Sequence, residues 1–366
     1  MGKKLLIVAN HFATIYKFRK ELITELIKNN DVLLIMPVGE YTDEFIKLGC
    51  SVQDIKINRR GKNILEEIVL FIQLRKIIKT EKPDKVVTYS IKPNIYVGLI
   101  CRLLNISYYA NITGLGTAFE KKWTKYIVTL FYKISFKKIS KVFFENESNL
   151  SVFKKSKIIS EDRCILLNGA GVNLDEYKFK EMRFDSDKTV FIFIGRVMKE
   201  KGIDELIFAA KKIKSKYEDR VAINIVGFFE DEYEQIIKEL NSKGIIQYLG
   251  FKKDVKPYLY EANCLILPSY HEGMANTILE ASSCGRAVIA SRIPGCQESV
   301  VDNMTGLLIN PRDKIDLYEK MNEFILLQHE AKIKMGIEAR LHIEAFFDRK
   351  KIIYDTLTAM DVAVLK

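Results

Sequence analysis

Two carboxylates stand close together in one short segment of the chain. Glu272 lies in the turn Ser269–Met274, which follows an apolar run at Cys264–Leu267, and Glu280 lies eight positions later in a helical pattern that begins near Asn276. A short apolar run of this kind is typical of a buried strand. Because ligands bind at the carboxyl edge of open α/β sheets, we expect both carboxylates and several helix N-terminal amides at such an edge.

A second strand–loop–helix pattern offers positive charge suited to a phosphate. An apolar strand pattern ends at Gly195, Arg196 and Lys201 follow it, and a helix pattern opens at Gly202. Gly195 lets a ligand approach the backbone closely, and the helix amides beyond Gly202 favour an anion. Arg196 offers a bidentate fork and Lys201 a point charge. Together these groups predict a site that suits a phosphate.

The two segments resemble the signatures of the retaining family-4 glycosyltransferases, which have the GT-B fold. The segment Glu272–Glu280 matches the family's E-x7-E signature, and Gly195–Gly202 is similar to its G-R-x-x-x-E-K-G segment. The resemblance implies an α/β protein of two Rossmann-like, doubly wound domains that face a central cleft. It further implies a nucleotide-sugar donor in the second domain and an acceptor in the first.

The resemblance also assigns roles on the donor side. Arg196 and Lys201 would bind the diphosphate and stabilise the leaving group, so that no metal or other cofactor is required, and Glu272 would face the transferred sugar; these three are the expected catalytic residues. Glu280 would accept hydrogen bonds from the ribose hydroxyls. The other expected donor contacts come from the turn, from its following helix and from a base-binding loop: Gly195, Phe251, Lys252, Gly273, Met274, Ala275, Asn276 and Thr277.

Paired carboxylates are also the machinery of glycoside hydrolysis, in which retaining enzymes hold two carboxyls about 5–5.5 Å apart. The spacing of Glu272 and Glu280 does not exclude this, but a hydrolase has no role for the phosphate site at Arg196 and Lys201. A retaining transferase has another route, since the departing phosphate oxygen can take the acceptor proton on the same face of the sugar. A nucleotide-sugar epimerase or hydrolase stays open as an alternative, and turnover without an acceptor would reveal it.

The first half of the chain has candidate acceptor residues after its strand patterns. The K-P-N-I-Y pattern at 92–96 and the I-T-G-L-G pattern at 112–116 resemble a narrower group of enzymes, which extend sugars on undecaprenyl diphosphate in capsule, O-antigen or protein-linked glycan assembly. This implies a UDP-hexose or UDP-N-acetylhexosamine donor and a polyprenyl-diphosphate saccharide acceptor. Lys92 and Arg19 would contact the acceptor diphosphate. The full set of expected acceptor contacts is His11, Arg19, Lys92, Asn111, Thr113 and Glu120.

Two features of this half depart from the family pattern. No Gly-Gly pair follows the first strand, and no histidine follows the strand pattern at 106–110, where many relatives have one that binds the sugar. His11 has an alternative role as a cap at the end of the first strand.

The net charge of +11 predicts an anionic partner. The segment 121–141 contains seven lysines with no acid among them and interleaved aromatic residues such as Trp123 and Tyr126. A basic, aromatic helix of this kind can lie on an anionic membrane surface; alternatively, it buries its aromatic face and leaves its lysines in water. We expect no binding to nucleic acid, because 47 acidic residues dilute the charge and no recognised motif is present. A basic protein that binds an anionic ligand without catalysis is the least favoured alternative.

Alternating strand and helix patterns predict parallel sheets covered by helices. The expected domains are 1–175 and 188–345, separated by a polar linker, with a C-terminal helix at 346–366 that crosses back to the first domain. No run of 18 apolar residues predicts a membrane span, and the six scattered cysteines indicate reduced thiols rather than disulfides or a metal site. We therefore expect a cytoplasmic protein, and the resemblance implies that it lies peripherally on the inner face of the cell membrane. The strands are expected at Lys4–Ala9, Val32–Met36, Val52–Ile55, Lys85–Tyr89, Ile106–Ala110, Val142–Phe144, Val190–Gly195, Val221–Val226, Ile246–Leu249, Cys264–Leu267 and Ala287–Ala290.

Overall fold

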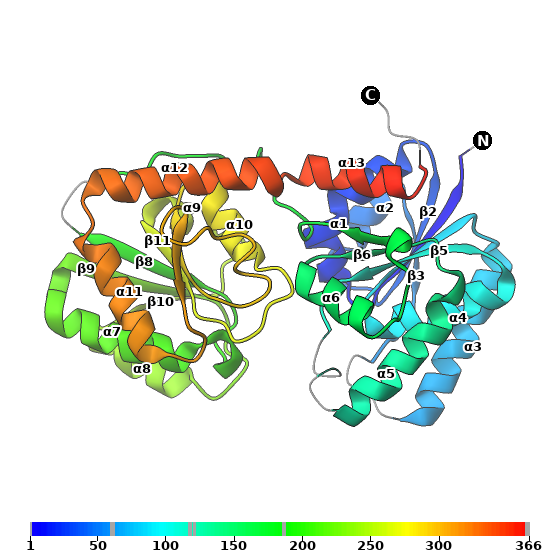
Figure 1. The fold of residues 1–366 in the computed structure, drawn as a ribbon, viewed down its shortest axis with the longest axis horizontal. Coiled ribbons are helices and arrows are strands. Elements are labelled where there is room, and N and C mark those ends of the chain that lie inside the picture. The colour runs from blue at the N-terminus through cyan, green and yellow to red at the C-terminus, as the bar shows by residue number, and fades with distance from the viewer. Residues whose placement is uncertain (1, 59–62, 116–118, 120–121, 185–187, 363–366) are drawn as a thin grey trace. The chain divides into compact units, whose positions relative to one another are not determined.

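The computed structural model describes residues 2–58, 63–115, 119, 122–184 and 188–362. It divides into two compact units, each built on one parallel sheet (Figure 1). Unit 1 comprises the chain up to Ala170 and from Lys350 onward, and unit 2 comprises Gly171–Arg349. The C-terminal segment therefore belongs to the same unit as the N-terminus.

The sheet of unit 1 has the strand order β3-β2-β1-β4-β5-β6-β7, with all pairs parallel. The order reverses between β1 and β4, and this reversal marks where ligands bind in doubly wound sheets. Its strands are β1 Lys4–Val8, β2 Asp31–Met36, β3 Ser51–Asp54, β4 Lys85–Tyr89, β5 Ser107–Ile112, β6 Lys141–Phe144 and β7 Cys164–Leu166.

Helices cover both faces of this sheet because successive strand residues point to opposite faces. Leu6 and Val8 join a core with α3, α4, α5 and α6, whereas Leu5 and Ile7 join a core with α1, α2 and α13. The last helix is held by Ile352 and Leu357 in that second core. The helices are α1 Phe12–Ile27, α2 Thr42–Lys47, α3 Ile64–Glu81, α4 Ile91–Leu104, α5 Lys122–Ser135, α6 Glu147–Lys155 and α13 Arg349–Ala359.

The sheet of unit 2 has the strand order β10-β9-β8-β11-β12-β13, again all parallel, and it reverses between β8 and β11. A large apolar core runs through it from Phe191 to Met335, and a smaller cluster includes Met274 and Leu279. The strands are β8 Thr189–Ile194, β9 Val221–Val226, β10 Gln247–Gly250, β11 Cys264–Leu267, β12 Ala287–Ser291 and β13 Gly306–Ile309. The helices are α7 Ile203–Tyr217, α8 Glu234–Ser242, α9 Lys256–Glu261, α10 Asn276–Ser283, α11 Lys314–Leu326 and α12 His329–Phe346.

The predicted strands are all present, with ends shifted by one or two residues at most. Two strands were not predicted, β7 and β13, because both are short and β7 is only partly buried. Helices α2 and α6 were also missed. Helix α13 spans Arg349–Ala359, within the segment 346–366 in which the C-terminal helix was predicted.

The segment expected as a linker is packed against unit 2 where the structure describes it. The Ser283 hydroxyl donates to the carbonyl of Tyr177 at 2.7 Å, and the guanidinium of the buried Arg286 donates to the carbonyl of Lys180. Met182 is buried. Side chains of unit 2 therefore satisfy backbone carbonyls of this segment.

Among the helices that the structure describes, none combines the length and the apolar character needed to cross a membrane.

Candidate functional site

The strongest grouping of predicted residues lies where the order of the second sheet reverses. The loops after β8 and β11 meet there, and the Tyr270 amide donates to the carbonyl of Glu200 at 2.8 Å. Gly202 has a φ of 72°, and a Cβ at this position would overlap the carbonyl of Pro268. The glycine therefore lets the two loops pack directly on each other.

This packing joins two of the predicted catalytic residues. Lys201 Nζ lies 2.5 Å from Glu272 Oε1, and both side chains are mostly buried. A buried carboxylate needs such a partner, because an unpaired charge is costly to remove from water. The predicted phosphate-binding lysine and the predicted sugar-facing glutamate thus form one ion pair.

The third predicted catalytic residue, Arg196, is also paired. Its Nη1 atom lies 2.5 Å from Glu230 Oε2 in the loop after β9, and both side chains are partly exposed. Two backbone amides also link these loops: the Val197 amide donates to the carbonyl of Phe228 at 2.8 Å, and the Lys199 amide donates to the side-chain carboxylate of Asp231 at 2.9 Å. Glu230 was not predicted, although it too follows a strand at the carboxyl edge.

A buried network lies behind Glu272. The Tyr270 hydroxyl donates to the carboxylate of Glu205, with 2.9 Å to each oxygen, and Arg312 lies over the Tyr270 ring at 4.8 Å. Glu205 lies in the first turn of α7, where a helix N-terminus favours negative charge. This network fixes the turn that contains Glu272.

In the segment that leads into α10, some backbone amides already donate hydrogen bonds. The Ala275 amide donates to Gly295 at 2.8 Å, and the Asn276 amide donates to Met274 at 3.0 Å. These two backbone donors were expected to face the ligand, and the structure shows that each already has a backbone acceptor, one in the segment after β12 and one in the turn itself. In contrast, Asn276 Oδ1 has no hydrogen-bond partner among the described residues, and Thr277 lies in the first turn of α10, where amides have no partner within the helix.

Glu280, the second predicted glutamate, lies in the middle of α10. The Tyr177 hydroxyl hydrogen bonds to its carboxylate, and burial together with this neighbouring negative charge raises the pKa of Tyr177. The Tyr177 ring also packs near Met274 and Leu279. Tyr177 precedes Glu280 by about a hundred positions and lies in the predicted linker, so no sequence signal indicated the contact.

The predicted base-binding loop presents an exposed aromatic pair. Phe251 lies edge-on to Phe228, with 6.1 Å between ring centroids, and both rings are exposed. Lys252 lies near the ring of Tyr258, with 5.5 Å from its Nζ to the centroid. Phe228 follows β9 and Phe251 follows β10, so both rings lie at the carboxyl edge of the sheet.

In unit 1, His11 and Arg19 are committed to local contacts. His11 Nδ1 accepts the Ala13 amide at 3.1 Å, so His11 caps the N-terminus of α1. Arg19 is buried, and its Nη2 atom lies 2.5 Å from Glu145 Oε1. Burial raises the pKa of Glu145, while the Arg19 charge opposes this shift. Arg19 would therefore have to leave a buried ion pair in order to contact a diphosphate as predicted.

Lys92 is held at the start of α4 by a residue of α3. It forms an ion pair with Glu67, whose other oxygen accepts the Tyr96 hydroxyl at 2.7 Å, and Lys92 also donates to the carbonyl of Asn58 at 2.6 Å. Lys92 follows β4, which borders the strand-order reversal of this sheet. The structure thus places this predicted acceptor residue at the carboxyl edge of the sheet.

The remaining acceptor candidates differ in their surroundings. Asn111 is buried within β5, where its Nδ2 donates to Thr88 at 3.3 Å and its carbonyl accepts from Asn94 at 2.9 Å. Thr113 is half-buried directly after β5. Glu120 lies outside the described residues.

Ser90 has a backbone conformation that sequence inspection did not reveal. Its φ of 74° and ψ of 161° lie in a region that is populated almost only by glycine, and it caps α4 at the same sheet edge. Such strain costs about 1–3 kcal/mol and concentrates at functional sites. The strained backbone of Ser90 therefore makes the turn between Tyr89 and Lys92 a candidate part of a functional site.

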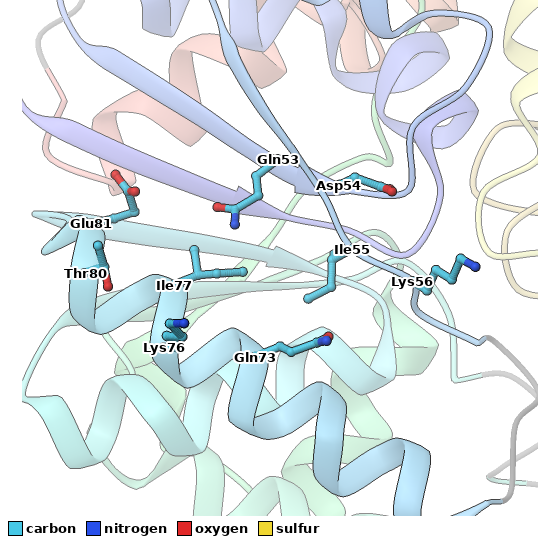
Figure 2. Close-up of a pocket in the computed structure, with 9 residues that line it drawn as sticks. All are labelled: Gln53, Asp54, Ile55, Lys56, Gln73, Lys76, Ile77, Thr80 and Glu81. Atoms are coloured by element: carbon cyan, nitrogen blue, oxygen red, sulfur yellow. The ribbon is translucent and has the colours of Figure 1, made fainter.

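A groove of about 580 Å³ lies elsewhere on unit 1 (Figure 2). It runs between the edge strand β3 with its following segment and the second half of α3, and Ile55 and Ile77 are among its lining residues. No predicted site residue lines it. Among the described residues, no group of three or more His, Cys, Asp or Glu side chains is arranged to hold a metal ion.

Comparisons with known proteins bear on both units. The model of the "Glycosyl transferases group 1" family matches residues 175–342, and that of the "Glycosyl transferase 4-like" family matches residues 4–146. The two matches together span most of the chain.

Curated relatives are similar over most of the chain. An N,N'-diacetylbacillosaminyl-diphospho-undecaprenol α-1,3-N-acetylgalactosaminyltransferase from Campylobacter jejuni is 27% identical over 344 residues, which cover 89% of each chain. A UDP-Gal:α-D-GlcNAc-diphosphoundecaprenol α-1,3-galactosyltransferase from Escherichia coli is 28% identical over 314 residues, 79% of each chain.

A solved structure has the same fold. The HepE protein of Anabaena, crystallised with UDP, superposes with a TM-score of 0.79 at 16% identity and covers 98% of this chain and 99% of its own.

Proposed function

The chain belongs to the group 1 glycosyltransferases, the family-4 enzymes with the GT-B fold, and we propose that it moves a hexose or N-acetylhexosamine from a UDP-sugar to a polyprenyl-diphosphate-linked saccharide. The product would serve the assembly of a capsule, an O-antigen or a glycoprotein glycan. The relatives from C. jejuni and E. coli, named for transfer to undecaprenyl-diphosphate-linked sugars, support this acceptor class.

The observation that supports the reaction most directly is the convergence of Lys201 and Glu272 at the strand-order reversal, with Arg196 on the same loop as Lys201. When a donor binds, the side chains of Lys201 and Arg196 contact its diphosphate. There they stabilise the negative charge that develops on the leaving UDP. These two cations supply the charge that a metal would otherwise bring, so we propose a metal-independent enzyme without a cofactor.

The proposed reaction retains the configuration of the transferred sugar. The bond between the anomeric carbon and the phosphate oxygen breaks, a bond to the acceptor oxygen forms on the same face, and the acceptor proton passes to the departing phosphate. No protein nucleophile is needed. Glu272 accepts hydrogen bonds from hydroxyls of the transferred sugar, and Glu280, oriented by Tyr177, accepts those of the ribose.

A lipid-linked acceptor implies a peripheral location at the inner face of the cell membrane. The lysines of the segment 121–141 support an interaction with anionic lipid. We expect no nucleic-acid partner.

The first test is a thermal-shift screen of UDP-sugars, with and without EDTA. A ligand at a hundred times its Kd adds about 2.7 kcal/mol to the free energy of unfolding. We expect a shift with UDP-sugars that survives EDTA and that is lost in Lys201→Ala. A transfer assay with a polyprenyl-diphosphate disaccharide then follows. Donor consumption at the full rate without any acceptor would instead favour an epimerase or hydrolase, and no shift with any nucleotide would overturn the proposal.

A further inference from the structure

Helix α5 has two apolar faces. Its inner face is buried through Tyr132, next to Phe136, in the core of unit 1. On the outer face, Trp123 is 74% exposed and Tyr126 is 68% exposed, and Leu130 continues the same stripe at helical spacing. The alternatives of a buried aromatic face and an exposed one are therefore both realised, on opposite sides of the helix.

Helix α3 repeats this arrangement in its first half. Its inner face is buried through Leu70, Leu74 and Ile78. Its outer face exposes apolar side chains in the first turns, with Ile64 at 74% and Leu65 at 72%. The other exposed apolar residues of α3 are Ile68, Val69 and Ile72. Beyond these the exposed positions are polar or charged, as in Gln73, Arg75, Lys76 and Lys79. The exposed apolar surface is thus confined to one end of the helix.

The topology brings the two apolar ends to one edge of the unit. Each helix follows a strand of the same parallel sheet, α3 after β3 and α5 after β5, so both begin at the carboxyl edge. Both pack on α4, in the helix layer that covers one face of the sheet (Figure 1). The same edge holds the acceptor candidates Lys92 and Thr113.

A direct contact links the apolar end of α3 to one of these candidates. Glu67 lies in the first turn of α3, between Ile64 and Ile68, and it holds Lys92 of α4 through an ion pair and Tyr96 through a hydrogen bond. A partner that fixes α3 therefore also fixes the side chain that we expect at the acceptor diphosphate.

The chemistry of the two stripes selects the partner. Exposed apolar patches on soluble folds mark protein or membrane contacts, and tryptophan and tyrosine favour the boundary between lipid and water. Exposed lysines lie in α5 and directly after it, at Lys125, Lys133, Lys137 and Lys138. This positive charge suits anionic headgroups and disfavours a second copy of the same charged surface.

We propose that the exposed apolar stripes of α3 and α5 form one surface that inserts into the headgroup region of an anionic bilayer and presents the acceptor edge of unit 1 to it. This deepens the proposed function, on which the identity of the acceptor edge rests. Insertion of this kind buries side chains without crossing the bilayer.

The chain contains a single tryptophan, Trp123, which makes it a direct reporter. We would record the emission spectrum of the full-length protein with vesicles of phosphatidylcholine alone and of phosphatidylcholine with phosphatidylglycerol. We expect a shift to shorter wavelength with the anionic vesicles, reversed by high salt. The double variant Trp123→Phe/Ile68→Trp moves the reporter to α3, and we expect the same shift.

A matched control uses the opposite end of the same helix layer. Leu103 is 71% exposed in the last turn of α4, away from the carboxyl edge. Trp123→Phe/Leu103→Trp should show no shift with either vesicle. In a flotation assay, Ile64→Ser/Leu65→Ser should reduce the vesicle-bound fraction by about tenfold or more, whereas Ile46→Ser/Leu103→Ser should leave it unchanged.

Each other outcome overturns the inference. A shift at Trp123 without one at Ile68→Trp would remove α3 from the surface. A shift in buffer that grows with protein concentration would assign the surface to self-association, and a shift at all three positions would indicate adsorption without a defined face. Thermal shifts with UDP, measured without vesicles, report on the proposed function independently, so failure of one does not imply failure of the other.

Discussion

Lys201 Nζ and Glu272 Oε1 lie 2.5 Å apart, although 71 positions of sequence separate the two residues. One follows β8 and the other follows β11, the two strands between which the order of the second sheet reverses. The lysine that should bind a diphosphate is thus already neutralised by the glutamate that should face the sugar. A donor must draw Lys201 away from Glu272, and this requirement favours a ligand with more than one negative charge.

The first prediction concerns this pair. Lys201→Ala should lower kcat/KM for the donor by about 100- to 1,000-fold, the range seen when one group that stabilises transition-state charge is removed. It should also lower the melting temperature, because Glu272 is left mostly buried and without this partner. Steady-state kinetics and thermal unfolding check the two effects.

The double variant Lys201→Ala/Glu272→Gln separates stability from function. It should recover part of the lost melting temperature, since no uncompensated charge remains, yet it should stay inactive. Full activity in Lys201→Ala would contradict the role of this lysine.

The second prediction concerns Arg196 and Glu230. Glu230→Gln removes the competing carboxylate and should tighten UDP binding by about 1.4- to fivefold, because a partly exposed ion pair is worth about 0.2–1 kcal/mol. Titration calorimetry measures the change. Glu234→Gln is the matched control, since Glu234 pairs with Lys238 on the exposed face of α8 and should leave UDP affinity unchanged. Weaker binding in Glu230→Gln would mean that Glu230 holds Arg196 in its productive position.

The sequence predicts the strands and the residues that lie at the edges of the sheets. Strands such as Cys264–Leu267 were found because parallel strands are buried on both faces and appear as apolar runs. Position after such a strand also sufficed to place Lys201, Glu272 and Lys92 at sheet edges. Edge placement depends on topology alone, and topology follows from the alternating pattern.

Pairings between side chains were beyond prediction, since they depend on how helices and loops pack. Nothing near Arg19 in the sequence indicates Glu145, and nothing near Glu280 indicates Tyr177. Likewise, interleaved lysines and aromatic residues at 121–141 could not show which aromatic rings are buried, because α5 has apolar positions on both faces.

The third prediction concerns Tyr177. Tyr177→Phe keeps the ring against Met274 and Leu279 but removes the hydroxyl that hydrogen bonds to Glu280. A hydrogen bond from ribose to a charged carboxylate is worth about 1.5–3 kcal/mol, so the wild-type enzyme should prefer UDP over 2'-deoxy-UDP by about 10- to 100-fold. Tyr177→Phe should narrow this preference. Tyr260→Phe is the control, because it loses hydrogen bonds of the hydroxyl to the carbonyl of Lys178 and to Cys284 but none to Glu280. An unchanged preference in Tyr177→Phe would remove Tyr177 from the ribose site.

The fourth prediction concerns the thiols. Burial raises the pKa of Cys284 to about 11 and that of Cys101 to about 12. The unfolded chain therefore ionises these thiols at lower pH than the folded chain does, so their contribution to stability falls as pH rises above about 9.

The exposure of the thiols can be checked by their reactivity. At pH 8, Cys164, the one partly exposed cysteine of the six, should react first with a thiol reagent. Cys164→Ser should abolish the fast phase, and a fast phase that persists would contradict the burial of the other five.

The last prediction separates the two cations expected at the acceptor diphosphate. Lys92→Ala should raise the KM for the lipid-linked acceptor and leave the KM for the UDP-sugar unchanged, since Lys92 lies at the edge of unit 1 and its partners Glu67 and Tyr96 remain bonded to each other. Lys76→Ala, an exposed lysine in the second half of α3, controls for loss of surface charge. Arg19→Ala cannot serve the same purpose, because it strands the buried Glu145 and should cost about 3–5 kcal/mol of stability. An acceptor KM that does not change in Lys92→Ala would remove this residue from the acceptor site and leave Thr113 as the candidate at the same edge.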